Sequence, residues 1–366
     1  MRRQLATAIA AASLLASGAL AVGDSQAETA ILIPGAQPFK QINPLYPIVA
    51  ATYPSIGTHF HTPDANMRLL GYSQNPLDSN RSLAQGVQRG VTEVSQTDGK
   101  VVVIGESMGS MVAWRVASEL DPDTPGAPSR DDLSFVLIAS PDAGISEYFK
   151  EGTYIPILNY RISRIDRSAY DTTIVIGEYD GWADPPDRPW NLIASANAIL
   201  GIAYVHGPPS FTADVSGLTP VNEVPRTEQY GSVTTYLVPT ENLPLTQVFR
   251  DVGVPDAVMD KADDVLRPVV DAGYVRHDKP GDTRPYLYDG EIRRNVQSQQ
   301  QAREPSTQRA ATTAQAVERR REHRGEIRQS IRAGLHDLRD KVEAGIGQLK
   351  KRLTKPASDH DGEPAE

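Results

Sequence analysis

The stretch VVVIGESMGSMVAW, residues 101–114, decides the fold. It begins with four β-branched apolar residues, Val101 to Ile104, which is typical of a buried strand. Gly105 to Gly109 follow as G-E-S-M-G, and apolar residues then recur at helical spacing from Met111. The stretch therefore predicts a strand, a sharp turn and a helix, with Ser107 in the turn.

A serine between two glycines in such a turn matches the nucleophile elbow. The strand must turn sharply so that the hydroxyl of Ser107 stands clear of the sheet edge, and side chains at the flanking glycines would collide. A glycine-rich turn with an incidental serine is the alternative, which the strand and the helix on either side disfavour. One oxyanion-hole donor is then the N–H of Met108, and the other is expected in the loop after the first strand, at Ala36 or Gln37.

A nucleophilic serine needs an imidazole to take its proton and a carboxylate to orient that imidazole. In α/β-hydrolases the chain order is serine, acid, histidine, and only two of the seven histidines, His206 and His277, lie after Ser107 and before the C-terminal tail. We favour His206, which follows a predicted helix and precedes a glycine- and proline-rich loop, over His277, which is flanked by charged residues.

The acid is expected directly after the strand in TTIVIGEYDGWADPP. Asp180 follows the glycine that ends this strand and is our choice for the orienting acid. Asp184, next to two prolines, is the reserve acid, because its side chain can instead stabilise the loop by hydrogen bonds to the backbone nearby.

A competing pattern, His59-Phe-His61-x-x-Asp64, resembles a run of metal ligands, because alternate residues of a strand can place two imidazoles on one face. No third histidine in a matching context precedes the elbow, so we predict no metal and no cofactor. The chain also has no cysteine, which excludes disulfides, thiolate catalysis and cysteine-based metal sites. A net charge of −9 argues against nucleic-acid binding.

Continuous apolar strands alternate with amphipathic helices along most of the chain. This pattern predicts an α/β fold, with a mostly parallel sheet covered by helices on both faces. The expected strands are 30–33, 101–104, 135–139, 172–177 and 233–238, and the expected helices are 81–97, 108–120 and 191–200.

The N-terminal residues 1–27 combine a basic start, an apolar run and a small-x-small site, which indicates a cleaved signal peptide, with an uncleaved anchor as the alternative. We therefore expect a secreted or cell-envelope protein outside the cytoplasmic membrane. Residues 28–288 form the predicted hydrolase domain, and residues 289–326 read as a polar linker.

Residues 327–355 form a predicted basic amphipathic helix, which can lie on an anionic membrane surface, self-associate or pack on the main domain. Residues 356–366 are expected to be a disordered tail.

Four segments resemble the PE-PPE domain, a serine α/β-hydrolase domain of actinobacteria with mycolic-acid envelopes that is related to cutinases. They are IGESMGS, IGEYDGWADPPDRPWNLIASANAILGIAYVHG, VTTYLVPTENLPL and VLRPVVDAGYVR, and the resemblance covers roughly residues 30 to 278. The block from aspartate to histidine is far more specific than the elbow. The resemblance implies Ser107 as nucleophile, Asp180 as acid and His206 as base, but Glu106 departs from the aromatic residue that is common at its position.

This family contains esterases and lipases, and members with a signal sequence are similar to acyltransferases that move fatty acyl groups onto trehalose. We therefore expect an exported serine enzyme that acts on lipid or acyl-ester substrates through an acyl-enzyme, with trehalose as the expected acceptor. A simple esterase or lipase of short to medium acyl esters is the alternative, and a non-catalytic envelope-binding protein is the alternative of another class.

Overall fold

The computed structural model describes residues 29–37, 50–124, 127–207, 210 and 212–294. The chain divides into two units, Met1–Arg294 and Asn295–Glu366. The predicted signal peptide (1–27), the basic helix (327–355) and the C-terminal tail (356–366) lie outside the described residues.

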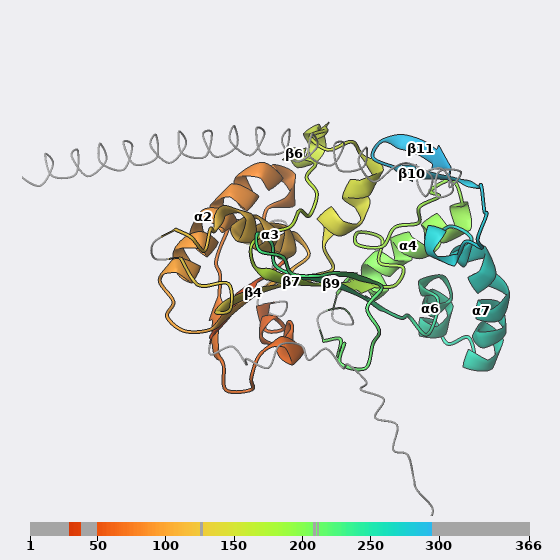
Figure 1. The fold of residues 1–366 in the computed structure, drawn as a ribbon. Helices are drawn as coiled ribbons and strands as arrows, with labels where there is room; N and C mark the ends of the chain where they lie inside the picture. The colour runs from red at the N-terminus through yellow and green to blue at the C-terminus, as the bar shows by residue number, and fades with distance from the viewer. Residues whose placement is uncertain (1–28, 38–49, 125–126, 208–209, 211, 295–366) are drawn as a thin grey trace, which may run out of the picture. The chain divides into compact units, whose positions relative to one another are not determined.

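A seven-stranded sheet forms the centre of the first unit, in the order β2-β1-β3-β4-β7-β9-β8 (Figure 1). All neighbouring strands run parallel except β8, which pairs antiparallel with β9 at one edge. Every residue of β1 and β3 is buried, as expected for parallel strands that are covered on both faces. The strands are β1 (Thr29–Ile33), β2 (Asn66–Leu69), β3 (Val101–Glu106), β4 (Leu133–Ile138), β7 (Asp171–Gly177), β8 (Asn222–Val224) and β9 (Val233–Val238).

Two helices, α2 (Ser79–Ser95) and α3 (Met108–Glu119), cover one face of the sheet (Figure 1). They approach each other closely because α2 has glycines at the contact. A Cβ atom at Gly86 would lie only 2.8 Å from a methyl group of Val112, and one at Gly90 only 2.6 Å from a methyl group of Val116. The close packing holds α3, and with it the turn at its start, firmly against β3.

The second face of the sheet carries its own apolar cluster, which includes Leu32, Ile104 and Val136. Among the described residues, this face is covered by short 3-10 turns at Tyr53–Ser55 and Thr58–Phe60 and by the loop that contains Val215 and Leu218. Helices thus predominate on one face, while turns and loops cover the described part of the other.

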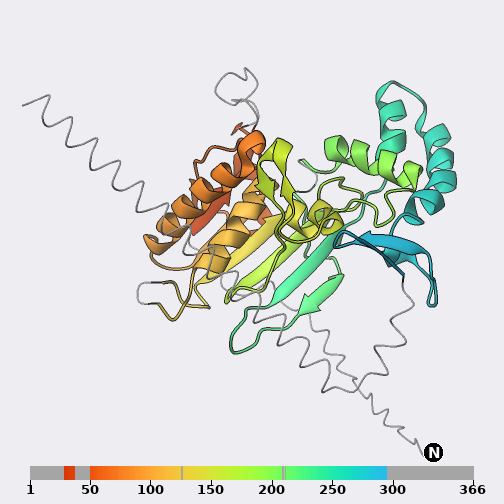
Figure 2. The ribbon, with the colours of Figure 1, turned by 90° about the horizontal axis from the view of Figure 1, so that it is seen from above.

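A group of three helices lies beyond the carboxyl ends of β7 and β9 (Figure 2): α4 (Leu192–Tyr204), α6 (Pro244–Asp251) and α7 (Asp256–Asp271). Their shared core consists of Tyr179, Ala194, Leu243, Val270 and Tyr274. The helix α4 follows the loop that begins after β7 and precedes the loop that begins at Val205. This group of helices therefore holds both loops at the edge of the sheet. Two small hairpins complete the unit: β5 (Tyr154–Ile155) with β6 (Tyr160–Arg161), and β10 (Pro285–Tyr288) with β11 (Glu291–Arg294).

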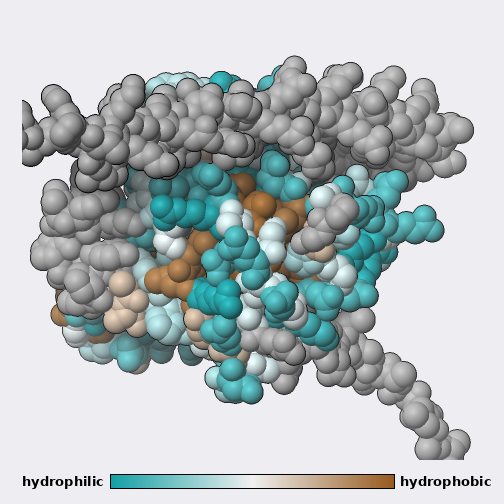
Figure 3. Space-filling view, turned by 90° about the vertical axis from the view of Figure 1, so that its left-hand side faces the viewer, coloured by the Kyte–Doolittle hydropathy of each residue, from teal (hydrophilic) through white to brown (hydrophobic). Residues whose placement is uncertain are grey.

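The strand β2 forms the other edge of the sheet. It pairs only with β1 in the described sheet and exposes Met67 and Leu69. Figure 3 views the molecule from this side, where an apolar area is bordered by hydrophilic residues. The strand is only four residues long, which limits the edge that it offers for pairing with another chain.

The predicted fold class is confirmed: a mostly parallel sheet, with a serine turn at the carboxyl end of a central strand, is the α/β-hydrolase fold. The expected helical cover of both faces is seen on one face, whereas turns and loops cover the described part of the other. The predicted C-terminal boundary of the domain moves from residue 288 to residue 294, because residues 289–294 belong to the β10–β11 hairpin and not to a polar linker. Within the residues described, no helix is long and apolar enough to cross a bilayer.

Candidate active site

The turn between β3 and α3 holds Ser107 in a strained backbone conformation, with φ 52° and ψ −121°. A Cβ atom at Gly105 would overlap the carbonyl oxygen of Gly109, and one at Gly109 would overlap the carbonyl oxygen of Ile33. Both flanking positions therefore require glycine, as the elbow pattern predicts.

The side chains of Ser107, His206 and Asp180 form one continuous hydrogen-bonded chain. His206 Nε2 lies 2.8 Å from Ser107 Oγ, and His206 Nδ1 lies 2.7 Å from Asp180 Oδ2. The other carboxylate oxygen of Asp180 accepts the N–H of Trp182 at 2.9 Å, which fixes the orientation of the carboxylate. The Asp180 side chain is fully buried and that of His206 is 13% exposed. This geometry lets the imidazole take a proton from the serine hydroxyl while the carboxylate stabilises the imidazolium.

The electrostatics of His206 favour the protonated ring. Burial opposes the charged form, but the hydrogen bond to Asp180 and the charges of Asp180 and Glu106 outweigh it and raise the pKa of His206 above its ordinary value. The ring is therefore a stronger base than a free histidine.

The reserve acid and the alternative histidine lie elsewhere. Asp184 accepts the N–H of Tyr179 at 2.7 Å and an N–H of Arg276 at 2.7 Å, so its two oxygens hold the loop together. Burial raises the pKa of Asp184 to about 6, although Arg276 opposes the shift. His277 Nε2 lies 3.6 Å from Asp271 Oδ1. The structure thus brings neither Asp184 nor His277 to Ser107.

The two predicted parts of the oxyanion hole flank Ser107. Met108 is the first residue of α3, where backbone N–H groups have no acceptor within the helix. On the other side, Gly35 packs so tightly that a Cβ atom there would lie 2.9 Å from the Cβ of Ser107. The N–H of Gln37 donates to the carbonyl oxygen of Gln74 at 2.8 Å, so it is already engaged, and Ala36 is the better candidate for the second donor.

The residues of the competing histidine pattern do not lie on a strand. His59 lies in the 3-10 turn Thr58–Phe60, and Nδ1 of His61 lies 2.7 Å from the carbonyl oxygen of Thr62. In the part of the chain that the structure describes, no three histidine, aspartate or glutamate side chains are close enough to hold a metal ion. The competing interpretation, in which alternate residues of a strand place two imidazoles on one face, therefore has no support among the described residues.

Sequence reasoning missed how Glu106 and Gln74 act on the loop after β1. The buried carboxylate of Glu106 accepts the N–H of Gly35 at 2.8 Å, and the side-chain amide of Gln74 donates to the carbonyl oxygen of Gly35 at 2.7 Å. The sequence marked Glu106 only as a departure from the family pattern, and it contained no signal for Gln74, because its contact spans 39 positions of the chain.

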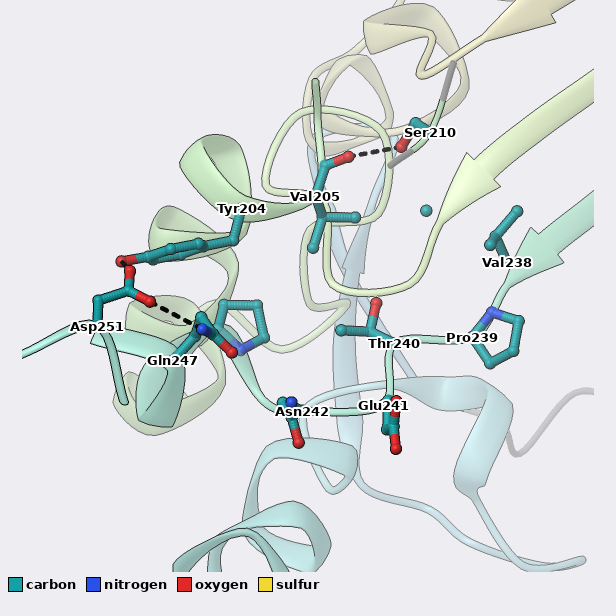
Figure 4. A pocket seen from close by; sticks show the side chains of 12 residues that line it. Tyr204, Val205, Ser210, Val238, Pro239, Thr240, Glu241, Asn242, Gln247 and Asp251 are labelled. Carbon is teal, nitrogen blue, oxygen red and sulfur yellow. Dashed lines mark hydrogen bonds between the residues drawn. The ribbon is translucent and has the colours of Figure 1, made fainter. Parts of the chain in front are cut away.

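A cavity of about 420 Å³ lies next to the loop that carries His206 (Figure 4). Its wall includes Val205 and residues 238–242. Three polar side chains of the wall are hydrogen-bonded to one another: Asp251 accepts hydrogen bonds from Tyr204 at 2.7 Å and from Gln247 at 2.9 Å. The residues that line it do not include Ser107, Asp180 or His206. The cavity is therefore separate from the hydrogen-bonded chain of the candidate site.

Comparison with known proteins places these features in one family. The model of the PE-PPE domain matches residues 54–275, which include Ser107, Asp180 and His206. The chain is 38% identical over 275 residues to the uncharacterized PPE family protein PPE63 of Mycobacterium tuberculosis, an alignment that covers 69% of this chain and 56% of that protein.

Two further relatives from Mycobacterium tuberculosis have named activities. The diacyltrehalose acyltransferase Chp2 is 39% identical over 186 residues, covering 48% of this chain and 51% of Chp2. The esterase PE16 is 35% identical over 213 residues, covering 55% of this chain and 39% of PE16. The aligned region spans about half the length of these curated relatives or less. Because the family model matches more than half of the chain, the protein belongs to the PE-PPE domain family.

Proposed function

We propose that the protein is a serine enzyme that transfers fatty acyl groups from an acyl ester to a trehalose-type sugar through an acyl-enzyme. The observation that carries the proposal is the position of the His206 ring, which contacts Ser107 Oγ through one nitrogen and Asp180 through the other. The names of two relatives, an acyltransferase and an esterase, support the same class of chemistry.

In the first half-reaction, Ser107 Oγ attacks the acyl carbonyl carbon while His206 Nε2 takes the hydroxyl proton. The carbonyl oxygen becomes an oxyanion that accepts hydrogen bonds from the N–H groups of Met108 and Ala36. His206 then gives the proton to the departing alcohol oxygen, the bond between the carbonyl carbon and that oxygen breaks, and the acyl group remains on Ser107.

In the second half-reaction, a sugar hydroxyl attacks the acyl-enzyme. His206 takes the hydroxyl proton, a second oxyanion forms in the same hole, and Ser107 leaves with the proton that His206 returns. The new acyl ester is released and the enzyme is restored.

An exposed apolar surface beside the acid loop fits an acyl chain. The helix α4 contains no charged residue, and a Cβ atom at its Gly201 would overlap the carbonyl oxygen of Tyr179, so the helix packs directly against the loop that carries Asp180. Large apolar side chains on and near this helix remain exposed: Trp182, Trp190, Leu192, Ile193 and Ile199. Such a concentration of exposed apolar residues marks binding to apolar partners.

Hydrolysis is the second candidate outcome. Transferase and esterase use the same residues and differ in whether water or a sugar hydroxyl takes the acyl group. The partial exposure of the His206 side chain favours access of water, and PE16 is named an esterase. Product analysis separates the two, because transfer yields an acylated sugar and hydrolysis yields a free fatty acid.

The sequence features outside the described residues add two parts to the proposal. We propose that the predicted signal peptide at residues 1–27 directs the protein out of the cytoplasm, to the medium or the envelope. We also propose that residues 327–355, for which the sequence predicts a basic amphipathic helix, contact anionic lipid. Mapping of the mature N-terminus in cell fractions tests the first part. Sedimentation with anionic vesicles, with and without residues 297–366, tests the second.

Labelling with a fluorophosphonate tests the nucleophile. Mass mapping of the labelled peptide is expected to place the phosphonate on Ser107. His206→Ala removes the base of the serine and Asp180→Asn leaves that base in the wrong tautomer, so both variants should label at least 100-fold more slowly. No label, or a label on another residue, would contradict the proposal and favour a binding protein that has only the fold of the enzyme.

A further inference from the structure

The residue before the nucleophile, Glu106, places a buried carboxyl group between the catalytic chain and the loop after β1. Its Oε2 lies 2.8 Å from the backbone nitrogen of Gly35, and no other residue could occupy position 35 without a collision. A Cβ atom there would overlap the Glu106 carboxylate and would lie 2.9 Å from the Cβ of Ser107. Glu106 therefore touches the loop at the point where the loop touches the nucleophile.

This loop, residues 34–37, is held on its other sides by neutral groups. Tyr72 donates its hydroxyl hydrogen to the carbonyl oxygen of Pro34, and Gln74 donates its side-chain amide to the carbonyl oxygen of Gly35, each at 2.7 Å. Both side chains are almost fully buried. Glu106 is an ionisable acceptor for this described loop, and the N–H that it binds precedes Ala36, the candidate oxyanion donor.

The charges around Glu106 connect it to the base. The pKa of Glu106 is raised to about 7, because burial and the charge of Asp180 outweigh His206 and the N–H of Gly35, which lower it. Burial raises the pKa of the Tyr72 phenol well above its ordinary value, and Glu106 and Tyr53 raise it further. His206 is the cation that forms in this group during the reaction, and the Glu106 charge contributes to its raised pKa.

We propose that Glu106 is a positioning residue for acyl transfer: its carboxyl group holds residues 34–37 against Ser107 through Gly35, and its negative charge stabilises the imidazolium of His206. This role rests on the proposed function. The charge has two opposed effects on the tetrahedral intermediate, because it attracts the imidazolium and repels the oxyanion. Removing the charge while keeping the acceptor should therefore change the pH dependence more than the maximal rate.

Two substitutions separate the acceptor from the charge. Glu106→Gln keeps an oxygen that can accept the N–H of Gly35 and removes the charge. Glu106→Met has similar length but removes both. Glu147→Gln is the matched control, because Glu147 is a partly buried glutamate whose pKa, like that of Glu106, is raised to about 7 by burial, and the charges that act on it are those of Arg164 and Asp187, not of the catalytic chain. All variants are made in the full chain and compared in the hydrolysis of a p-nitrophenyl acyl ester.

Glu106→Gln is expected to keep kcat at alkaline pH within about tenfold of wild type, while the acid limb of kcat/KM moves to lower pH by about 1 unit, as loss of a nearby opposite charge implies. Glu106→Met should lower kcat by about 100-fold with a much smaller change in KM, because a misplaced loop removes an oxyanion donor. Glu147→Gln should not change the pH at which the acid limb of kcat/KM lies.

An acid limb that stays in place in Glu106→Gln, or that moves equally in Glu147→Gln, would overturn the role of Glu106. A Glu106→Met protein that folds and keeps its kcat would do the same, and the limb of Glu106→Gln decides the question if Glu106→Met does not fold. Activity that persists in Ser107→Ala would instead refute the proposed function itself. The two failures are therefore distinguishable.

Discussion

Asp180 and Asp184 lie in the same loop after β7, but only Asp180 contacts His206, at 2.7 Å from Nδ1. Asp184 instead binds the Arg276 guanidinium and the N–H of Tyr179. The two carboxylates therefore have different roles. Asp180 orients the imidazole, and Asp184 stabilises the loop that contains Asp180.

The first prediction follows from this division. Asp180→Asn should lower kcat by about 10⁴-fold with little loss of stability, because the amide cannot hold the histidine in the reactive tautomer. Asp184→Asn should leave kcat close to wild type but lower the free energy of unfolding by about 1–3 kcal/mol, because Arg276 loses the nearer of its two charged partners, Asp184 and Glu178, in a mostly buried site. Steady-state kinetics and urea unfolding measure the two effects. Equal losses of kcat in both variants would show that turnover needs Asp184 as much as Asp180 and would contradict this division.

The pH dependence of turnover provides a second prediction. Only neutral His206 can take the serine proton, so kcat/KM should rise with pH, with an apparent pKa above the ordinary value of 6.5. Asp180 and Glu106 raise the pKa of His206, so the limb should move to lower pH when either carboxylate becomes an amide. A wild-type limb below 6.5 would mean that burial dominates the pKa of this histidine and would contradict the electrostatic account.

The third prediction concerns the stability of the fold against pH. Burial raises the pKa of Glu147 from 4.5 to about 7, so between these values the folded protein binds more protons at this site than the unfolded chain does. The contribution of Glu147 to stability is thus fully present below about pH 4.5 and is lost as the pH rises to about 7. Glu147→Gln should therefore gain in Tm relative to wild type between pH 4.5 and 7. Tm measured across this range tests it, and a constant difference would contradict it.

The fourth prediction concerns the elbow. Gly109→Ala should prevent folding or abolish turnover, because the added methyl group would overlap the backbone of Ile33 in β1. Gly217→Ala is the matched control, since a Cβ atom at Gly217 has no atom within 4 Å, and it should leave both Tm and turnover unchanged. A folded and active Gly109→Ala protein would show that the turn tolerates a different backbone path.

Much of the sheet could be predicted because its strands are continuous apolar runs. The expected strand at 233–238 matches β9 at both ends, and the expected helix at 108–120 differs from α3 by one residue. The helix α7 was missed because its exposed face is rich in aspartate and carries Val265, and because Pro268 lies inside it. The edge strand β2 has only four residues, too few for a period to be recognised.

The active site, too, could be predicted only in part from the sequence. Chain order and turn chemistry singled out Ser107, Asp180 and His206, and the structure brings these three side chains together, while their catalytic roles remain a prediction. Long-range contacts had no local signature. Gln37 was an equal candidate with Ala36 until its N–H was seen to bind the carbonyl oxygen of Gln74, and the link from Glu106 to Gly35 joins residues 71 positions apart.

The most direct test of the central claim is turnover of a p-nitrophenyl acyl ester by wild type, Ser107→Ala and the control Ser118→Ala, with and without trehalose. Ser118 lies on α3, where its hydroxyl donates to the carbonyl oxygen of Trp114, away from the catalytic chain. We expect wild type and Ser118→Ala to release p-nitrophenol and, with trehalose present, to form an acylated sugar that mass spectrometry detects, while Ser107→Ala does neither. Release of free fatty acid alone would identify an esterase. Equal turnover in Ser107→Ala and wild type would contradict the account.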